Sequence, residues 1–172
     1  MWHLPRVLGM TALYACLVVP SVVADTPDRP ATTPNTIAPD FTRPDLSGRP
    51  LQLNQFRGRV VLLNFWATWC GPCITEIPLF SNWQRQYGDA GLQVIGVSMD
   101  DDAAAVKRFV AKHKVSYPIV MGDAKLGESF GGVFGLPQTF LIDAHGRIVL
   151  RSVGEPNMEA LRSQIEGLIG VH

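Results

Sequence analysis

Apolar residues cluster in short continuous runs, and the clearest run predicts a buried strand. Residues 60–66 are Val-Val-Leu-Leu-Asn-Phe-Trp, with one polar side chain among seven. A run of this length and composition is typical of a central strand in a parallel sheet, which is covered on both faces. Residues 92–97, Leu-Gln-Val-Ile-Gly-Val, predict a second central strand.

Helical periodicity replaces this pattern in two other segments. Residues 74–87 predict a helix, because the following positions recur at helical spacing: Ile77, Phe80, Trp83 and Gln84. The last helix is expected after Asn157, whose side chain is a good N-cap. Its expected core face consists of Leu161, Ile165, Leu168 and Ile169.

Three acidic residues, Asp100 to Asp102, precede a helix expected over residues 103–113. They supply N-cap candidates and negative charge at the helix N-terminus, where both are favourable. The alternative is a metal site, but the spacing of a calcium-binding loop does not follow. The expected buried face of this helix is Val106, Phe109 and Val110.

Shorter elements complete the pattern. Leu46 and Leu51 flank the turn Ser47-Gly48-Arg49 and predict a β-hairpin before the core. Residues 118–121 predict a short strand, and residues 125–130 a short helix closed by two glycines. A second hairpin is expected from residues 139–142 and 147–153. The order ββ, βαβα, ββα predicts an α/β fold with a mixed sheet and helices on both faces.

The 172 residues fit one domain preceded by a separate N-terminal segment. The chain has 15 basic and 15 acidic residues and no basic tract, so no nucleic-acid partner is implied. Residues 1–24 carry one basic side chain and then an apolar stretch, which predicts a signal peptide or, alternatively, a membrane anchor. A third possibility is lipidation at Cys16. Residues 25–36 predict a flexible linker, and residues 37–172 the folded domain.

The candidate chemistry lies in Cys70-Gly71-Pro72-Cys73, between the first strand and its helix. The i, i+3 spacing on a first helical turn places both sulfurs on one face, close enough to bond. The helix N-terminus favours a thiolate at Cys70, and the thiolate is the species that attacks a disulfide. A structural zinc site would need four ligands, but the chain has three cysteines and scattered histidines. An inert staple would close too small a loop to stabilise much.

Several motifs together resemble the TlpA/ResA-like exported thiol–disulfide oxidoreductases, of the AhpC/TSA–redoxin type within the thioredoxin-fold superfamily. The matching segments are Pro39-Asp40-Phe41, Phe56-Arg57-Gly58, residues 64–73 (Asn-Phe-Trp-Ala-Thr-Trp-Cys-Gly-Pro-Cys), Glu76-Ile77-Pro78 and residues 135–140 (Gly-Leu-Pro-Gln-Thr-Phe). The resemblance covers residues 37 to the C-terminus. It implies a thioredoxin-like fold, a central mixed sheet flanked by helices with an extra N-terminal hairpin.

The resemblance assigns roles to individual residues. Cys70 is similar to an exposed attacking cysteine, and Cys73 to a buried resolving one. Pro137 is similar to a cis-proline facing the disulfide, and the backbone of Leu136 would pair with the substrate chain; the alternative is an ordinary trans proline. The expected substrate-binding residues are Trp69, Gly71, Pro72, Leu136 and Pro137.

Two residues depart from thioredoxin itself. Asn64 stands where thioredoxin has a buried aspartate, six residues before the first cysteine, and it cannot accept a proton. Glu76 lies three residues after Cys73, where the TlpA/ResA-like proteins carry a functional acid. If burial raises its pKa, this carboxylate can accept the Cys73 proton. The alternative is a surface glutamate on the first turns of the helix.

The resulting expectation is a periplasmic, monomeric dithiol reductant without a cofactor. The resemblance implies exported disulfide-containing proteins as targets, apocytochrome c among them, and a membrane thiol reductant of the DsbD/CcdA type. An oxidase or isomerase is the alternative within the same chemistry, because the direction depends on reduction potential. A copper-delivery protein on the same scaffold is the alternative from another class, although such proteins use CxxxC with a downstream histidine.

Overall fold

The computed structural model describes residues 35–171 together with residue 1. Residues 2–24 of the predicted signal peptide or anchor, with Cys16 among them, therefore lie outside the described residues, as does most of the predicted linker. Within the described part, no helix combines the length and the apolar composition needed to cross a membrane.

A five-stranded mixed sheet forms the centre of the domain, with the spatial order β5-β4-β3-β6-β7. The strands are β3 (Val60–Trp66), β4 (Leu92–Ser98), β5 (Ile119–Met121), β6 (Gln138–Ile142) and β7 (Ile148–Val153). β3 is the middle strand, and all seven of its residues are buried. It pairs in parallel with β4 and antiparallel with β6. The mixed α/β fold predicted from the sequence is confirmed.

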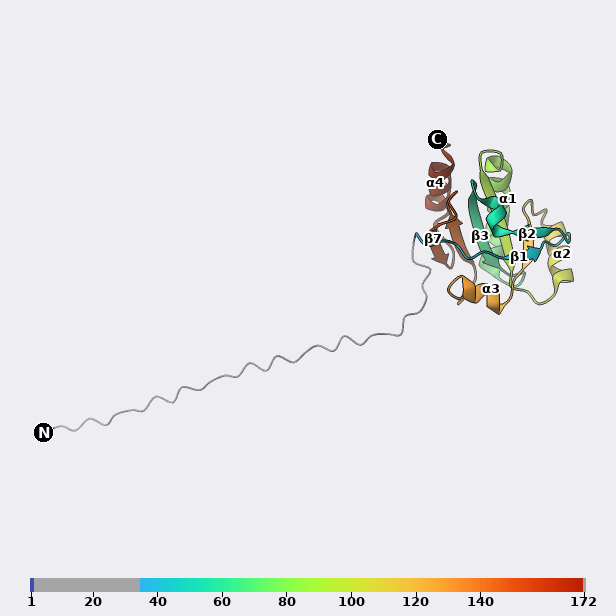
Figure 1. The fold of residues 1–172 in the computed structure, drawn as a ribbon. Coiled ribbons are helices and arrows are strands. Elements are labelled where there is room, and N and C mark those ends of the chain that lie inside the picture. Colours follow the sequence, from blue (N-terminus) through green and yellow to red (C-terminus); the bar gives the residue numbers. More distant parts are fainter. Residues whose placement is uncertain (2–34, 172) are drawn as a thin grey trace.

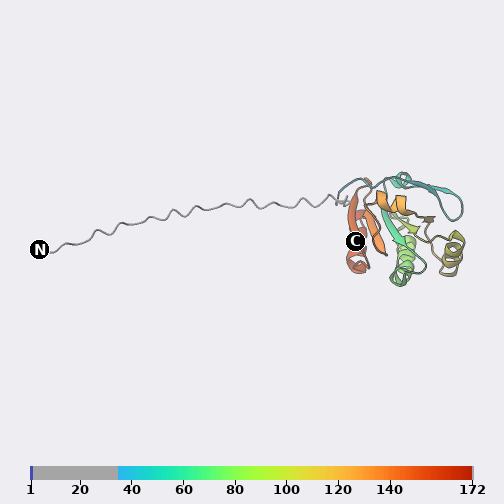
Figure 2. The same ribbon diagram turned by 90° about the horizontal axis from the view of Figure 1, so that it is seen from below.

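Helices cover both faces of this sheet, as Figures 1 and 2 show. The helices are α1 (Gly71–Tyr87), α2 (Ala103–Lys112), α3 (Ala124–Ser129), α4 (Met158–Ile169) and a short 3-10 helix (Leu53–Phe56). Side chains of α1, α2 and α4 join the apolar cluster on one face. The other face is covered by α3, the 3-10 helix and the predicted hairpin, which forms from β1 (Thr42–Pro44) and β2 (Pro50–Gln52).

The predicted caps explain where two helices begin. Asp102 caps α2, because its carboxylate accepts a hydrogen bond from the Ala104 N–H at 2.8 Å. Asn157 caps α4 through a 2.9 Å hydrogen bond from the Ala160 N–H. Each cap satisfies a backbone donor that has no partner inside its own helix.

The predicted core faces of α4 and α2 include residues that are exposed or only half-buried in the structure. Leu168 is exposed, because the last turn of α4 lies beside Val149 of the edge strand and small Gly167, which leave a hollow at its side chain. Phe109 and Val110 are half-buried and only Val106 is fully buried in α2, because this helix lies at the margin of the sheet. The periodicity identified the correct sides of the helices, but it did not identify where each helix passes the sheet edge.

Candidate active site

The end of β3 and the start of α1 bring the two cysteines together as a disulfide. The S–S distance between Cys70 and Cys73 is 2.02 Å, and their Cα atoms are 5.3 Å apart. Cys70 is the N-cap residue of α1, and its sulfur accepts a hydrogen bond from the Cys73 N–H at 3.3 Å. In the reduced protein this position favours a thiolate at Cys70, because helix N-terminal N–H groups stabilise negative charge.

The two cysteines differ in accessibility, but less than the sequence comparison implied. Cys70 was expected to be exposed, yet only 6% of its surface is accessible, while Cys73 is fully buried. The expectation of an openly exposed cysteine is wrong, because the Cys70 side chain belongs to the buried apolar cluster on this face of the sheet. Gly71 and Pro72 between them are exposed. An incoming thiol therefore meets Cys70 and not Cys73.

The segment before β6 lies against the same site. The Leu136–Pro137 peptide bond is cis, which confirms that expectation. Leu136 is half-buried and packs against the apolar cluster that contains both cysteines. The Pro137 carbonyl accepts a hydrogen bond from the Gly154 N–H at 2.8 Å, so the start of β6 is tied to the end of β7. Trp69, directly before Cys70, is 70% exposed.

An exposed aromatic side chain near this segment was not singled out from the sequence. Phe134, two residues before Leu136, is 66% exposed and lies over Gly132, where an added Cβ would meet its ring at 2.3 Å. The Gly132 carbonyl accepts hydrogen bonds from Arg151 at 2.9 Å and Gln138 at 3.2 Å. The available signal was an aromatic residue inside a glycine-rich segment directly before the recognised motif.

Glu76 is a buried carboxylate, so the surface alternative is wrong. Only 1% of it is accessible, although it lies on the second turn of α1. Its Oε2 accepts a hydrogen bond from the Asn64 Nδ2 at 3.3 Å, and the same amide donates to the Thr139 Oγ1 at 3.0 Å. Among the described residues, Glu76 Oε1 and the nearby Tyr117 hydroxyl have no hydrogen-bond partner.

The surroundings of Glu76 change its ionisation. Burial raises the pKa of Glu76 to about 7; the hydrogen bond from Asn64 opposes the shift, and the negative charge of Glu155 adds to it. Burial also raises the pKa of the Tyr117 phenol, and the charge of Glu76 raises it further. A carboxyl group with a pKa near neutrality can both accept and release a proton at working pH.

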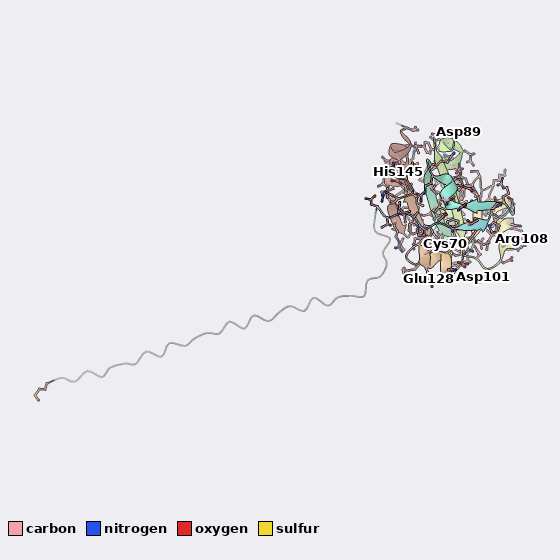
Figure 3. The ribbon with its side chains drawn as sticks, viewed as in Figure 1. Cys70, Asp89, Asp101, Arg108, Glu128 and His145 are labelled. Atoms are coloured by element: carbon pink, nitrogen blue, oxygen red, sulfur yellow. A yellow bond between two sulfur atoms is a disulfide. The ribbon has the colours of Figure 1, made fainter. Side chains whose placement is uncertain are left out.

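The disulfide lies at one end of the molecule, and Figure 3 shows Cys70 at the same end as Asp101 and Glu128.

The histidines required by the copper-delivery alternative lie elsewhere. His113 follows α2 and stacks on Phe109, with 4.0 Å between ring centroids. His145 lies in the turn between β6 and β7, and Figure 3 shows it far from Cys70. Over residues 35–171, no group of three or more histidine, cysteine or acidic side chains is arranged to hold a metal ion.

Comparisons with known proteins agree with this geometry. The model of the Redoxin family matches residues 33–169. The chain is 36% identical over 131 residues to the thiol-disulfide oxidoreductase ResA of Bacillus thuringiensis subsp. konkukian, covering 75% of each chain. It is 32% identical to ResA of Geobacillus thermodenitrificans over 141 residues, covering 82% of this chain and 81% of the relative.

Solved structures show the same fold. A crystal structure described as the thiol:disulfide interchange protein DsbE of Chlorobium tepidum superposes with a TM-score of 0.74 and 33% identity, covering 80% of this chain and 98% of that one. The thioredoxin domain of a thiol-disulfide oxidoreductase from Bacteroides vulgatus gives a TM-score of 0.71 with 27% identity, covering 79% and 97% of the two chains.

Proposed function

This chain belongs to the Redoxin family, and from that premise we propose that it is an exported reductant of protein disulfides. It is a thiol–disulfide oxidoreductase of the ResA/DsbE type. The observation that carries the proposal is the Cys70–Cys73 disulfide at the N-terminus of α1 with a buried carboxyl group, Glu76, one turn behind it. We propose that electrons flow from this protein to its targets, that the protein is exported, and that its targets are exported proteins with disulfides.

The proposed reaction has two disulfide exchanges. The Cys70 thiolate attacks one sulfur of the target disulfide, so that a mixed disulfide forms and the other target sulfur leaves as a thiolate. The Cys73 sulfur then attacks the Cys70 sulfur, closes the Cys70–Cys73 disulfide and releases the second target thiolate. Two electrons pass from the protein to its target. A membrane dithiol carrier of the DsbD/CcdA type then restores the dithiol.

Glu76 takes the role of proton acceptor for Cys73. The Cys73 thiol must lose its proton before it attacks, because a thiolate is the nucleophile. Glu76 lies three residues further along α1, where i and i+3 side chains are neighbours. Asn64 holds the carboxyl group by its 3.3 Å hydrogen bond and cannot itself take the proton.

The proposed location is the periplasm, reached through the segment 1–24. Exported targets suit a protein of this kind, and reduction of apocytochrome c before haem attachment is the proposed task. Such a reductant needs a membrane electron donor, because the periplasm is kept oxidising.

The reduction potential tests the direction. We expect the Cys70–Cys73 couple to lie well below the roughly −120 mV of a strong periplasmic oxidant, nearer the roughly −270 mV of thioredoxin, which shares the Gly-Pro dipeptide. Equilibration with glutathione or a dithiol buffer, followed by quantification of both redox forms, measures this value. A potential near that of the oxidant would instead support the oxidase alternative.

A further inference from the structure

Two hydrogen bonds tie the turn before Cys70 to Asp100, the second residue after β4. Asp100 Oδ2 accepts from the Thr68 N–H at 2.9 Å, and Asp100 Oδ1 accepts from the Thr68 hydroxyl at 2.6 Å. Thr68 is the second residue of the turn from Ala67 to Cys70, which is closed by a 3.1 Å hydrogen bond from the Cys70 N–H to the Ala67 carbonyl. One carboxylate therefore holds both donors of Thr68.

Asp100 is itself fixed to the sheet. The Ser98 hydroxyl donates to Asp100 Oδ2 at 2.8 Å and accepts from the Asp100 N–H at 3.2 Å. Ser98 is fully buried at the end of β4. The next residue, Met99, donates its N–H to the Trp66 carbonyl at 2.8 Å and so continues the pairing of β4 with β3. The carboxylate thus projects from a rigid strand end toward the cysteine turn.

Ala67 and Cys70, the two ends of the turn, are buried in the apolar cluster. Thr68 and Trp69 between them are not, so the hydrogen bonds to Asp100 hold the middle of the turn. Trp69 is 70% exposed and cannot anchor the turn by burial. The Cys70 sulfur accepts a 3.3 Å hydrogen bond from the Cys73 N–H at the start of α1, and the turn determines the position of this sulfur. We propose that Asp100 is a positioning residue for disulfide exchange, holding Cys70 at the helix N-terminus through Thr68. This inference rests on the proposed role of Cys70 as the attacking cysteine.

The direction in which Asp100→Asn shifts the pKa of the Cys70 thiol distinguishes a positioning role of Asp100 from a purely electrostatic one. Asp100→Asn removes a negative charge near the site, and this alone would lower the pKa of the Cys70 thiol. The same change leaves one oxygen to accept both Thr68 donors, so the turn loosens and the thiolate loses its helix N–H partners, which raises that pKa. Asp100 is only half-buried, so solvent screens its charge. We therefore expect the increase to prevail.

The other ionisable residues at this end of the molecule are the same in the wild type and in Asp100→Asn. Figure 3 places Asp101 and Glu128 at this end of the molecule. Cys73 is bonded to Cys70, and a chain of interactions within the same region connects Glu76 with Tyr117 and Glu155. Asp101 provides a matched control, because it is an exposed neighbour of Asp100, and neither Thr68 hydrogen bond goes to it. Asp101→Asn removes the same charge without touching the turn.

Alkylation of the reduced protein by iodoacetamide, followed against pH with the Cys70 product identified by peptide mass spectrometry, provides the test. For Asp100→Asn and Thr68→Val we expect alkylation at pH 7 to slow by about threefold and the titration midpoint to move upward. Thr68→Ser keeps the hydroxyl donor and should follow the wild type, as should Asp101→Asn. Thermal unfolding of each variant is measured in parallel.

A lowered or unchanged midpoint for Asp100→Asn would overturn the inference, and so would reduced thermal stability with an unchanged pH curve. Equal behaviour of Thr68→Ser and Thr68→Val would show that the hydroxyl bond does not hold the turn. A wild-type protein in which Cys73 reacts faster than Cys70 would contradict the proposed function itself, whatever the Asp100 variant shows.

Discussion

Cys73→Ser is expected to accumulate mixed disulfides between Cys70 and target proteins. Attack by Cys70 survives the substitution, while a serine hydroxyl at position 73 cannot displace the target. Position 73 is fully buried, so an external thiol cannot occupy it and attack the Cys70 sulfur in place of Cys73. Nearly all of the reacted protein should therefore stop at the intermediate, and non-reducing gel electrophoresis with mass spectrometry of the linked peptides measures it.

Cys70→Ser is the matched control for this trap. The remaining thiol at position 73 lies behind exposed Gly71 and Pro72 and has no accessible surface in the disulfide form. We expect it to capture little target under the same conditions. Equal trapping by the two variants would show that the roles of the two cysteines have been assigned wrongly. A model disulfide such as oxidised glutathione provides the same comparison without a known target.

The sequence allowed the main elements of the fold to be predicted because local and global signals agree there. The run from Val60 to Trp66 is apolar because β3 is covered on both faces, and this property is visible without a structure. The caps at Asp102 and Asn157 are local hydrogen bonds, so residue type alone indicates them. Leu168 was misplaced because its exposure depends on the position of β7, which periodicity does not contain.

The parts of the site that lie in local motifs could be predicted, whereas the contacts between distant segments could not. The cysteine pair and cis Pro137 lie in recognisable motifs, whereas Asp100 and Thr68 are 32 positions apart and meet only because β3 and β4 are neighbours. The low accessibility of Cys70 follows from its place in an apolar cluster built from distant segments, which the local motif does not specify. Glu76 was named as a candidate, but its burial follows from the position of α1 over the middle strand, where Asn64 faces it.

The pKa of Glu76 predicts a dependence of stability on pH. Its folded value of about 7 lies above the ordinary 4.5, so the unfolded chain releases this proton first as pH rises. The contribution of Glu76 to the free energy of unfolding is fully present below about pH 4.5 and is lost as the pH rises to about 7. Between these two pH values the unfolded state binds fewer protons than the folded state, so raising the pH favours unfolding. Glutamine stays neutral throughout. Oxidised Glu76→Gln should match the wild type near pH 4 and be more stable at pH 8, by at most about 3 kcal/mol.

Urea unfolding at both pH values measures that difference, with Glu155→Gln as the exposed control. Glu155 accepts a hydrogen bond from Thr75 and only adds to the shift at Glu76, so its substitution should have a small effect. Identical stability curves for the wild type and Glu76→Gln would mean that Glu76 does not carry a raised pKa.

Glu76→Gln is also expected to slow the resolving step by about a hundredfold at pH 7, which is the usual contribution of a general base. Glutamine retains an oxygen that can accept the Asn64 hydrogen bond, so the change removes basicity while the position of the side chain is kept. Release of glutathione from a preformed mixed disulfide at Cys70 isolates this step. In the wild type the rate of glutathione release should rise near pH 7, where Glu76 becomes ionised.

In the Glu76→Gln variant this rise in rate should move toward the ordinary thiol pKa of about 8.5, because Cys73 must then lose its proton to solvent. Because the acid and the thiol titrate as a coupled pair, whole rate curves are compared rather than single assigned values. Superimposable curves would leave Glu76 without a part in proton transfer, even if the stability difference were found.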